Sequence, residues 1–185
     1  MLPSITSEKE YSDLRKQLEP WRDTVREVLR KHELAVPDGT LRLGRQATYP
    51  TVLAGDEHVV KLFGPWWSGP ESLEAELAAY AAFAGRGLPV PALRAHGQVD
   101  NGWSYLVLEQ LRGRDLVAVR DELDSDTLVE LAAWLGRFCR ALNATPLARE
   151  GYLSSSWGRF RRFLAARREE VIERDSEASR LPPHL

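Results

Sequence analysis

The spacing of apolar residues changes from helical to strand-like near residue 40. Up to that point apolar side chains recur every three or four positions, as in amphipathic helices, at Tyr11, Leu14, Leu18, Trp21, Val25 and Val28. Ser7 with Glu10 forms a capping box at the start, and Pro20 marks a kink or the first turn of a second helix. From Thr40 onward the period is two, which predicts an antiparallel meander of strands at residues 41–43, 49–53 and 59–63.

The rest of the chain predicts a helix, a hairpin and then helices only. A helix begins at Pro70, ends at Gly85, and carries one apolar stripe of Leu73, Leu77, Tyr80 and Phe83. Asn101 and Gly102 form the turn of a hairpin between residues 93–99 and 103–111. A further helix, capped by Asp124 or Ser125, is expected to turn inward Leu128, Leu131, Leu135, Phe138 and Leu142, and a last helix begins at about Ser156. This order predicts an α+β fold, most simply with one five-stranded antiparallel sheet.

Composition narrows the class of protein. With 185 residues, of which 43% are apolar, the chain can bury a real core as one domain or two small lobes. A net charge of −2 gives no whole-molecule attraction to nucleic acid or to an anionic membrane, so neither is expected as a partner. Cys139 is the single cysteine, which fits a reducing cytosol. We find no signal peptide and no membrane-spanning run of roughly 18 apolar residues, and we expect a cytoplasmic protein.

Two charged residues stand out against apolar surroundings. Lys61 is the one charge in the strand 59–63, where burial is costly unless an anion meets it. On composition alone the favoured interpretation is an edge lysine whose stem reaches to water. Glu76 lies at helical spacing from Tyr80 and Phe83, so it could border the inward stripe and reach Lys61. Its alternative is a solvated acidic face, which the helix dipole favours.

The strand 105–111 is a third candidate. It is apolar and ends just before Gly113 and the helical half of the chain. Its last backbone donors and acceptors could hydrogen-bond a flat heteroaromatic ring. Any hairpin strand that ends at a turn presents similar groups, so this pattern alone is weak.

In combination these features resemble a known family. Residues 41–146 are similar to the ATP-binding part of the aminoglycoside phosphotransferase and choline kinase-like group, whose members share the bilobal protein-kinase-like fold. The order and spacing of the pieces carry the resemblance, and no single piece is diagnostic. The pieces are Val59-Val60-Lys61-Leu62-Phe63, Glu76-Leu77-Ala78-Ala79-Tyr80, Leu88-Pro89-Val90-Pro91 with Gly97, residues 106–116, and Ala141-Leu142-Asn143-Ala144-Thr145-Pro146.

The resemblance implies a role for each matching position. Lys61 would hold the α- and β-phosphates of ATP, and Glu76 would fix its orientation. The Glu109 carbonyl and the Leu111 amide would bind the adenine edge, with Leu108 behind the ring. The implied cofactors are ATP and Mg²⁺, and the implied partner is a small molecule with a hydroxyl group.

The resemblance also implies an organisation of the chain. We expect an N-terminal helical extension over residues 1–35, an ATP-binding N-lobe over 36–113, and the start of a helical C-lobe over 114–185. The N-lobe would hold the five-stranded sheet and one main helix. Its loop at residues 44–48 has one glycine where protein kinases use several, so phosphate binding by backbone amides is not evident.

The second departure from the family concerns catalysis. The family places its catalytic aspartate in a His-Gly-Asp type loop, yet no histidine here is followed two residues later by aspartate. Asp124 and Asp126 stand at a helix start, where capping is the favoured role over metal binding. We therefore assign no catalytic base and no metal ligand, and expect the chain to stop before the segment that supplies them.

Three functions follow from these observations. The leading one is an ATP-dependent small-molecule phosphotransferase whose chain, as given, at best binds nucleotide. The alternatives are a non-catalytic nucleotide-binding or regulatory module, and an unrelated α+β interaction domain if Lys61 proves exposed without a carboxylate. The acceptor, the oligomeric state and the origin of the truncation stay open.

Overall fold

The computed structural model describes residues 2–34, 40–45 and 47–146, together with residues 161–169 apart from 163, 166 and some side chains. Two compact units form, Met1–Pro146 and Leu147–Leu185, and the first holds the sheet. The predicted last helix begins outside the described residues, and the described part of 161–169 is helical. Among the helices that are described, none is long and apolar enough to cross a membrane.

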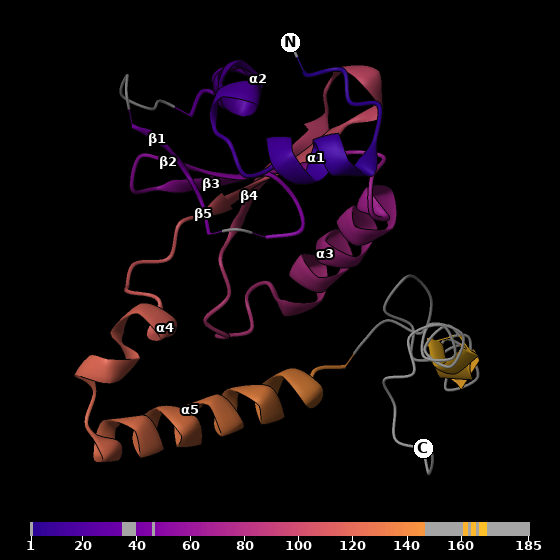
Figure 1. The fold of residues 1–185 in the computed structure, drawn as a ribbon. Coiled ribbons are helices and arrows are strands. Elements are labelled where there is room, and N and C mark those ends of the chain that lie inside the picture. Colours follow the sequence, from indigo (N-terminus) through magenta and orange to yellow (C-terminus); the bar gives the residue numbers. More distant parts are fainter. Residues whose placement is uncertain are drawn as a thin grey trace. The chain divides into compact units, whose positions relative to one another are not determined.

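The first unit is built on one antiparallel sheet of five strands in the order β1-β2-β3-β5-β4 (Figure 1). The predicted α+β fold with its meander and hairpin is therefore confirmed. The strands are β1 (Leu41–Leu43), β2 (Thr51–Ala54), β3 (His58–Phe63), β4 (Leu93–Gln98) and β5 (Ser104–Glu109). The short 3₁₀ turn η1 (Asp100–Gly102) joins the last two strands, and both Asn101 and Gly102 take the left-handed conformation expected of this pair.

Two N-terminal helices cover one face of the sheet. They are α1 (Glu8–Leu14) and α2 (Glu19–Lys31), so Pro20 lies in the first turn of a second helix. Trp21 and Val25 are fully buried against sheet residues that include Val60 and Tyr105. The Ser7 hydroxyl accepts a hydrogen bond from the Glu10 amide at 3.2 Å, as a helix cap should.

One helix, α3 (Gly69–Phe83), packs on the opposite face. Its Leu73, Leu77 and Tyr80 contact a second core cluster that includes Phe63 and Leu108 of the sheet. The sheet thus has a helical layer on each side (Figure 1). The helix α3 packs on the face from which the Lys61 side chain reaches Glu76. This arrangement is consistent with a protein-kinase-like N-lobe.

The described residues between β5 and residue 146 form helices and short turns but no strand, as predicted, and one prediction about them is wrong. They form α4 (Leu116–Val119), the 3₁₀ turn η2 (Arg120–Glu122) and α5 (Ser125–Asn143). Asp124 caps α5, since its side chain accepts a hydrogen bond from the Thr127 amide at 2.7 Å. No residue of α5 is buried, and Leu131 and Leu135 of the stripe predicted to turn inward are exposed. The apolar spacing identified the helix but not a partner for its stripe.

Candidate functional site

Lys61 and Glu76 form an ion pair between the sheet and α3. The Lys61 Nζ donates a hydrogen bond to Glu76 Oε1, and the two side chains are 21% and 28% exposed. Strand β3, which carries Lys61, lies at the centre of the sheet between β2 and β5. The interpretation of Lys61 as an edge lysine reaching to water is therefore wrong, and so is that of Glu76 as part of a solvated acidic face.

The surroundings of Lys61 fix where its charge lies. Its Nζ is 5.3 Å from the centroid of the Phe63 ring, which a cation favours. In the sheet Lys61 stands opposite Thr51 of β2 and Leu106 of β5. Because the Lys61 side chain is partly exposed, its ammonium can still meet an anion while Glu76 holds its orientation.

The Leu108 side chain, near the end of β5, lies on the same face of the sheet as the Lys61–Glu76 ion pair. Leu108 is nearly buried and shares a core cluster with Phe63. The backbone amides of Glu109 and Gln110 each donate a hydrogen bond of 2.8 Å within the fold. The next amide, that of Leu111, donates none in the described part of the chain, and the Leu111 side chain is exposed. An unpaired amide at a strand end is available to a planar ligand.

The five candidate residues thus come from two neighbouring strands of the sheet and from the helix α3 that packs on them. Lys61 lies on β3, Glu76 on α3, and Leu108, Glu109 and Leu111 lie at or just after the end of β5. The structure brings Lys61 and Glu76 into contact and sets Leu108 on their side of the sheet. Their roles in nucleotide binding stay a prediction.

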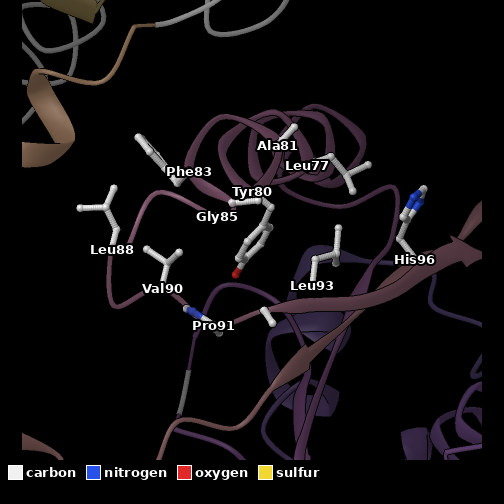
Figure 2. Close-up of a pocket in the computed structure, with 12 residues that line it drawn as sticks. Leu77, Tyr80, Ala81, Phe83, Gly85, Leu88, Val90, Pro91, Leu93 and His96 are labelled. Carbon is white, nitrogen blue, oxygen red and sulfur yellow. The ribbon is translucent and has the colours of Figure 1, made fainter.

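A pocket of about 630 Å³ opens beside this layer, under the second half of α3 (Figure 2). Its walls are the end of α3, the segment 84–92 and the start of β4, and most of the lining is apolar. The Tyr80 side chain points into the middle of the pocket, toward Val90 and Pro91 (Figure 2). Burial, and secondarily the charge of Glu76, raise the pKa of Tyr80 to about 12.

This shift predicts a pH dependence at the alkaline end. The folded-state pKa of Tyr80 lies above its ordinary value of 10, so the contribution to stability is complete below pH 10 and lost as the pH rises toward 12. We expect Tyr80→Phe to flatten the fall in unfolding free energy between pH 10 and 12 and to remove one tyrosinate absorbance step near pH 12. An identical alkaline profile in the variant would contradict the prediction.

Metal-binding chemistry is not visible in the described residues. No group of three or more acidic, histidine or cysteine side chains there could hold a metal ion. Asp124 is occupied with its capping bond to Thr127, which lowers the pKa of its carboxyl group. We assign no Mg²⁺ ligand among the described residues.

Sequence reasoning missed the contacts of the segment between β1 and β2. Arg45 in this segment forms an ion pair with Asp115, the residue that caps α4. Tyr11 of α1 and Arg15, the residue that follows α1, also hydrogen-bond its backbone. These pairs lie 32 to 70 positions apart in the chain, and no local pattern marks them.

Comparison with known protein families agrees with the geometry. The model of the phosphotransferase enzyme family matches residues 39–184. This range includes the whole sheet, the helix with Glu76 and the segment after β5, and it leaves α1 and α2 outside. The match covers most of the chain and is consistent with the aminoglycoside phosphotransferase and choline kinase-like resemblance. The chain therefore belongs to the phosphotransferase enzyme family.

Proposed function

We propose that this chain is the nucleotide-binding part of an ATP-dependent phosphotransferase that acts on a hydroxyl group of a small molecule. The observation that carries the proposal is the partly exposed Lys61–Glu76 ion pair at the centre of the sheet, in a chain of the phosphotransferase family. A lysine held in this way presents a fixed positive charge to phosphate oxygens. An ATP-consuming reaction and a single cysteine both fit a reducing cytoplasmic setting.

For the site residues we propose the roles that the family resemblance implies. Lys61 would neutralise the α- and β-phosphates, with Glu76 keeping the ammonium at the sheet surface. Leu108 would pack behind the adenine ring, while the Glu109 carbonyl and the unpaired Leu111 amide would hydrogen-bond its edge. Each of these residues binds or orients the nucleotide, and none moves a proton.

The transfer itself needs groups that the described residues do not supply. The acceptor oxygen would attack the γ-phosphorus in line, the bond to the β–γ bridging oxygen would break, and ADP would leave. The hydroxyl proton requires a base, and we assign none among the described residues. Mg²⁺, when bound, would neutralise phosphate charge, but the described residues do not form a site for it. We therefore expect the chain to bind ATP without transferring phosphate.

Calorimetry with ATP and a phosphate-transfer assay test this proposal together. We expect saturable binding of ATP and of adenosine by the folded 185-residue chain, with no phosphate transfer to a mixture of aminoglycosides, choline and sugars. Absence of ATP binding by a chain that unfolds cooperatively would overturn nucleotide binding. Transfer by the chain alone would overturn the proposed lack of catalytic groups. Binding without transfer in the complete gene product would favour the regulatory module.

A further inference from the structure

The segment 47–50, which leads into β2, lies beside Lys61. Strand β2 begins at Thr51, and Thr51 is the register partner of Lys61 in the neighbouring strand β3. Segment 47–50 therefore ends one residue away from the position directly opposite Lys61. An anion held by the Lys61 ammonium would therefore lie near segment 47–50.

One side chain of α1 and one from the residue directly after it hold the first two carbonyls of the segment. The Tyr11 hydroxyl donates a hydrogen bond to the Thr48 carbonyl at 3.1 Å, and the Arg15 guanidinium donates one to the Ala47 carbonyl. Tyr11 is fully buried, and the Arg15 guanidinium carbon lies 5.0 Å from the centroid of the Trp67 ring. Both donors are thus fixed by packing on the helix side of the segment.

The remaining carbonyls of the segment are also bonded. The Tyr49 carbonyl accepts a hydrogen bond from the Thr51 hydroxyl, and the Pro50 carbonyl accepts one from the Leu62 amide, each at 3.0 Å. Four successive carbonyls therefore have partners within the fold. Each carbonyl oxygen of this segment thus accepts a hydrogen bond.

In contrast, the N–H groups of Thr48 and Tyr49, which share peptide units with two of these carbonyls, have no hydrogen-bond partner in the described ranges. In a trans peptide the N–H points away from the C=O of the same unit, and the described residues include no cis peptide bond. The amides of Thr48 and Tyr49 consequently point away from α1. Neither donates a hydrogen bond in the described ranges, so two adjacent donors stay available. Successive unpaired amides form a concavity that suits an anion.

The charge of Arg15 adds to this effect. Its Nε is buried without a hydrogen-bond partner, and no acidic side chain of the described residues forms an ion pair with it. The guanidinium therefore leaves positive charge beside the segment that is not neutralised locally. A single-glycine segment can in this way offer phosphate-binding amides without the glycines that protein kinases use.

We propose that Tyr11 and Arg15, which precede the matched family region, are positioning residues that turn the Thr48 and Tyr49 amides toward the nucleotide's phosphates. The inference rests on the proposed ATP binding and adds to it a role for the N-terminal helix. The helix acts through carbonyls 47 and 48, so it contributes to phosphate binding without contacting the nucleotide. These two contacts act only on segment 47–50, so we expect them to leave the binding of adenine and ribose unchanged.

The test compares ATP and adenosine affinities of Arg15→Met, Arg15→Lys and the wild type by calorimetry. We expect Arg15→Met to weaken ATP binding about fivefold, the scale of one hydrogen bond, with adenosine affinity unchanged. Arg15→Lys, which keeps a charged donor, should recover most of the loss. Arg30→Met removes an exposed arginine of α2 that pairs with Glu27, and serves as the control for lost charge.

Hydrogen exchange gives a readout that needs no ligand. We expect faster amide exchange in residues 47–51 of Arg15→Met than of the wild type, with α2 unchanged. Equal weakening of ATP and adenosine, or wild-type affinities and exchange in Arg15→Met, would overturn the positioning role while ATP binding itself stands. Failure of the wild type to bind ATP would overturn the proposed function and this inference with it.

Discussion

Replacement of Lys61 by methionine is expected to weaken ATP binding at least tenfold, which corresponds to about 1.4 kcal/mol. The variant keeps the length of the stem in β3 but removes the charge that Glu76 orients. Adenosine, which has no phosphates, should bind the variant and the wild type equally. Isothermal calorimetry with both ligands separates the loss of the phosphate contact from damage to the adenine site.

Three companion variants make this result specific. Lys9→Met removes an exposed lysine of α1 and should leave both affinities unchanged. Glu76→Gln removes the orienting carboxylate and should weaken ATP binding less than the loss of the lysine itself. Lys61→Arg keeps the charge but changes its shape, and should recover only part of the affinity. An ATP affinity of Lys61→Met equal to that of the wild type would contradict the assigned role.

The second large effect concerns stability. Trp21→Ala should lower the unfolding free energy by about 3–5 kcal/mol, because it removes a fully buried ring from the core between α2 and the sheet. The Trp21 ring contacts Trp103, with centroids 5.2 Å apart, and its Nε1 donates a hydrogen bond to the Leu14 carbonyl at 3.1 Å. The substitution therefore also removes the bond that ties α2 to α1. Urea unfolding followed by circular dichroism measures the change.

A matched substitution on the other side of α2 controls for helix propensity. Arg26 is exposed on the same helix, and Arg26→Ala should change the unfolding free energy by no more than about 0.5 kcal/mol. A similar change for both variants would show that α2 contributes through its own helicity. A loss below about 1 kcal/mol for Trp21→Ala would contradict the core packing described here.

Much of the sheet could be predicted because its signals are local. Alternating apolar residues, the Asn101–Gly102 turn and the cap at Asp124 each act over a few residues, and the structure confirms all three. The middle strand of the meander begins at Thr51 instead of residue 49. Pro50 has no amide to donate to a neighbouring strand, so regular pairing begins after it.

The candidate site could be predicted only in part. Lys61 was recognisable as an unusual charge, but an edge lysine and a paired lysine have the same local sequence. The difference depends on strand order. Strand β3 is central only because β5, more than 40 residues later in the chain, pairs with its second edge. The contacts of Tyr11 and Arg15 with segment 47–50 are likewise set by tertiary packing alone.

For α5 the sequence predicted the helix but not the exposure of its apolar stripe. Leu131 and Leu135 recur at the spacing of a buried face, and the spacing correctly predicted a helix. It carried no information on what that face contacts. A periodic pattern states that a side is apolar, and only a neighbouring element can bury it.

The helical layer of α1 and α2 determines how far a stable fragment must extend before the matched family region. The family match begins at residue 39, whereas Tyr11, Trp21, Val25 and Val28 fill one face of the sheet from before that point. A fragment that starts at the matched boundary would expose Val60, Tyr105 and their neighbours to water and would tend to aggregate. We therefore expect a fragment that folds alone to include α1 and α2, which lie before the residues that the family model matches.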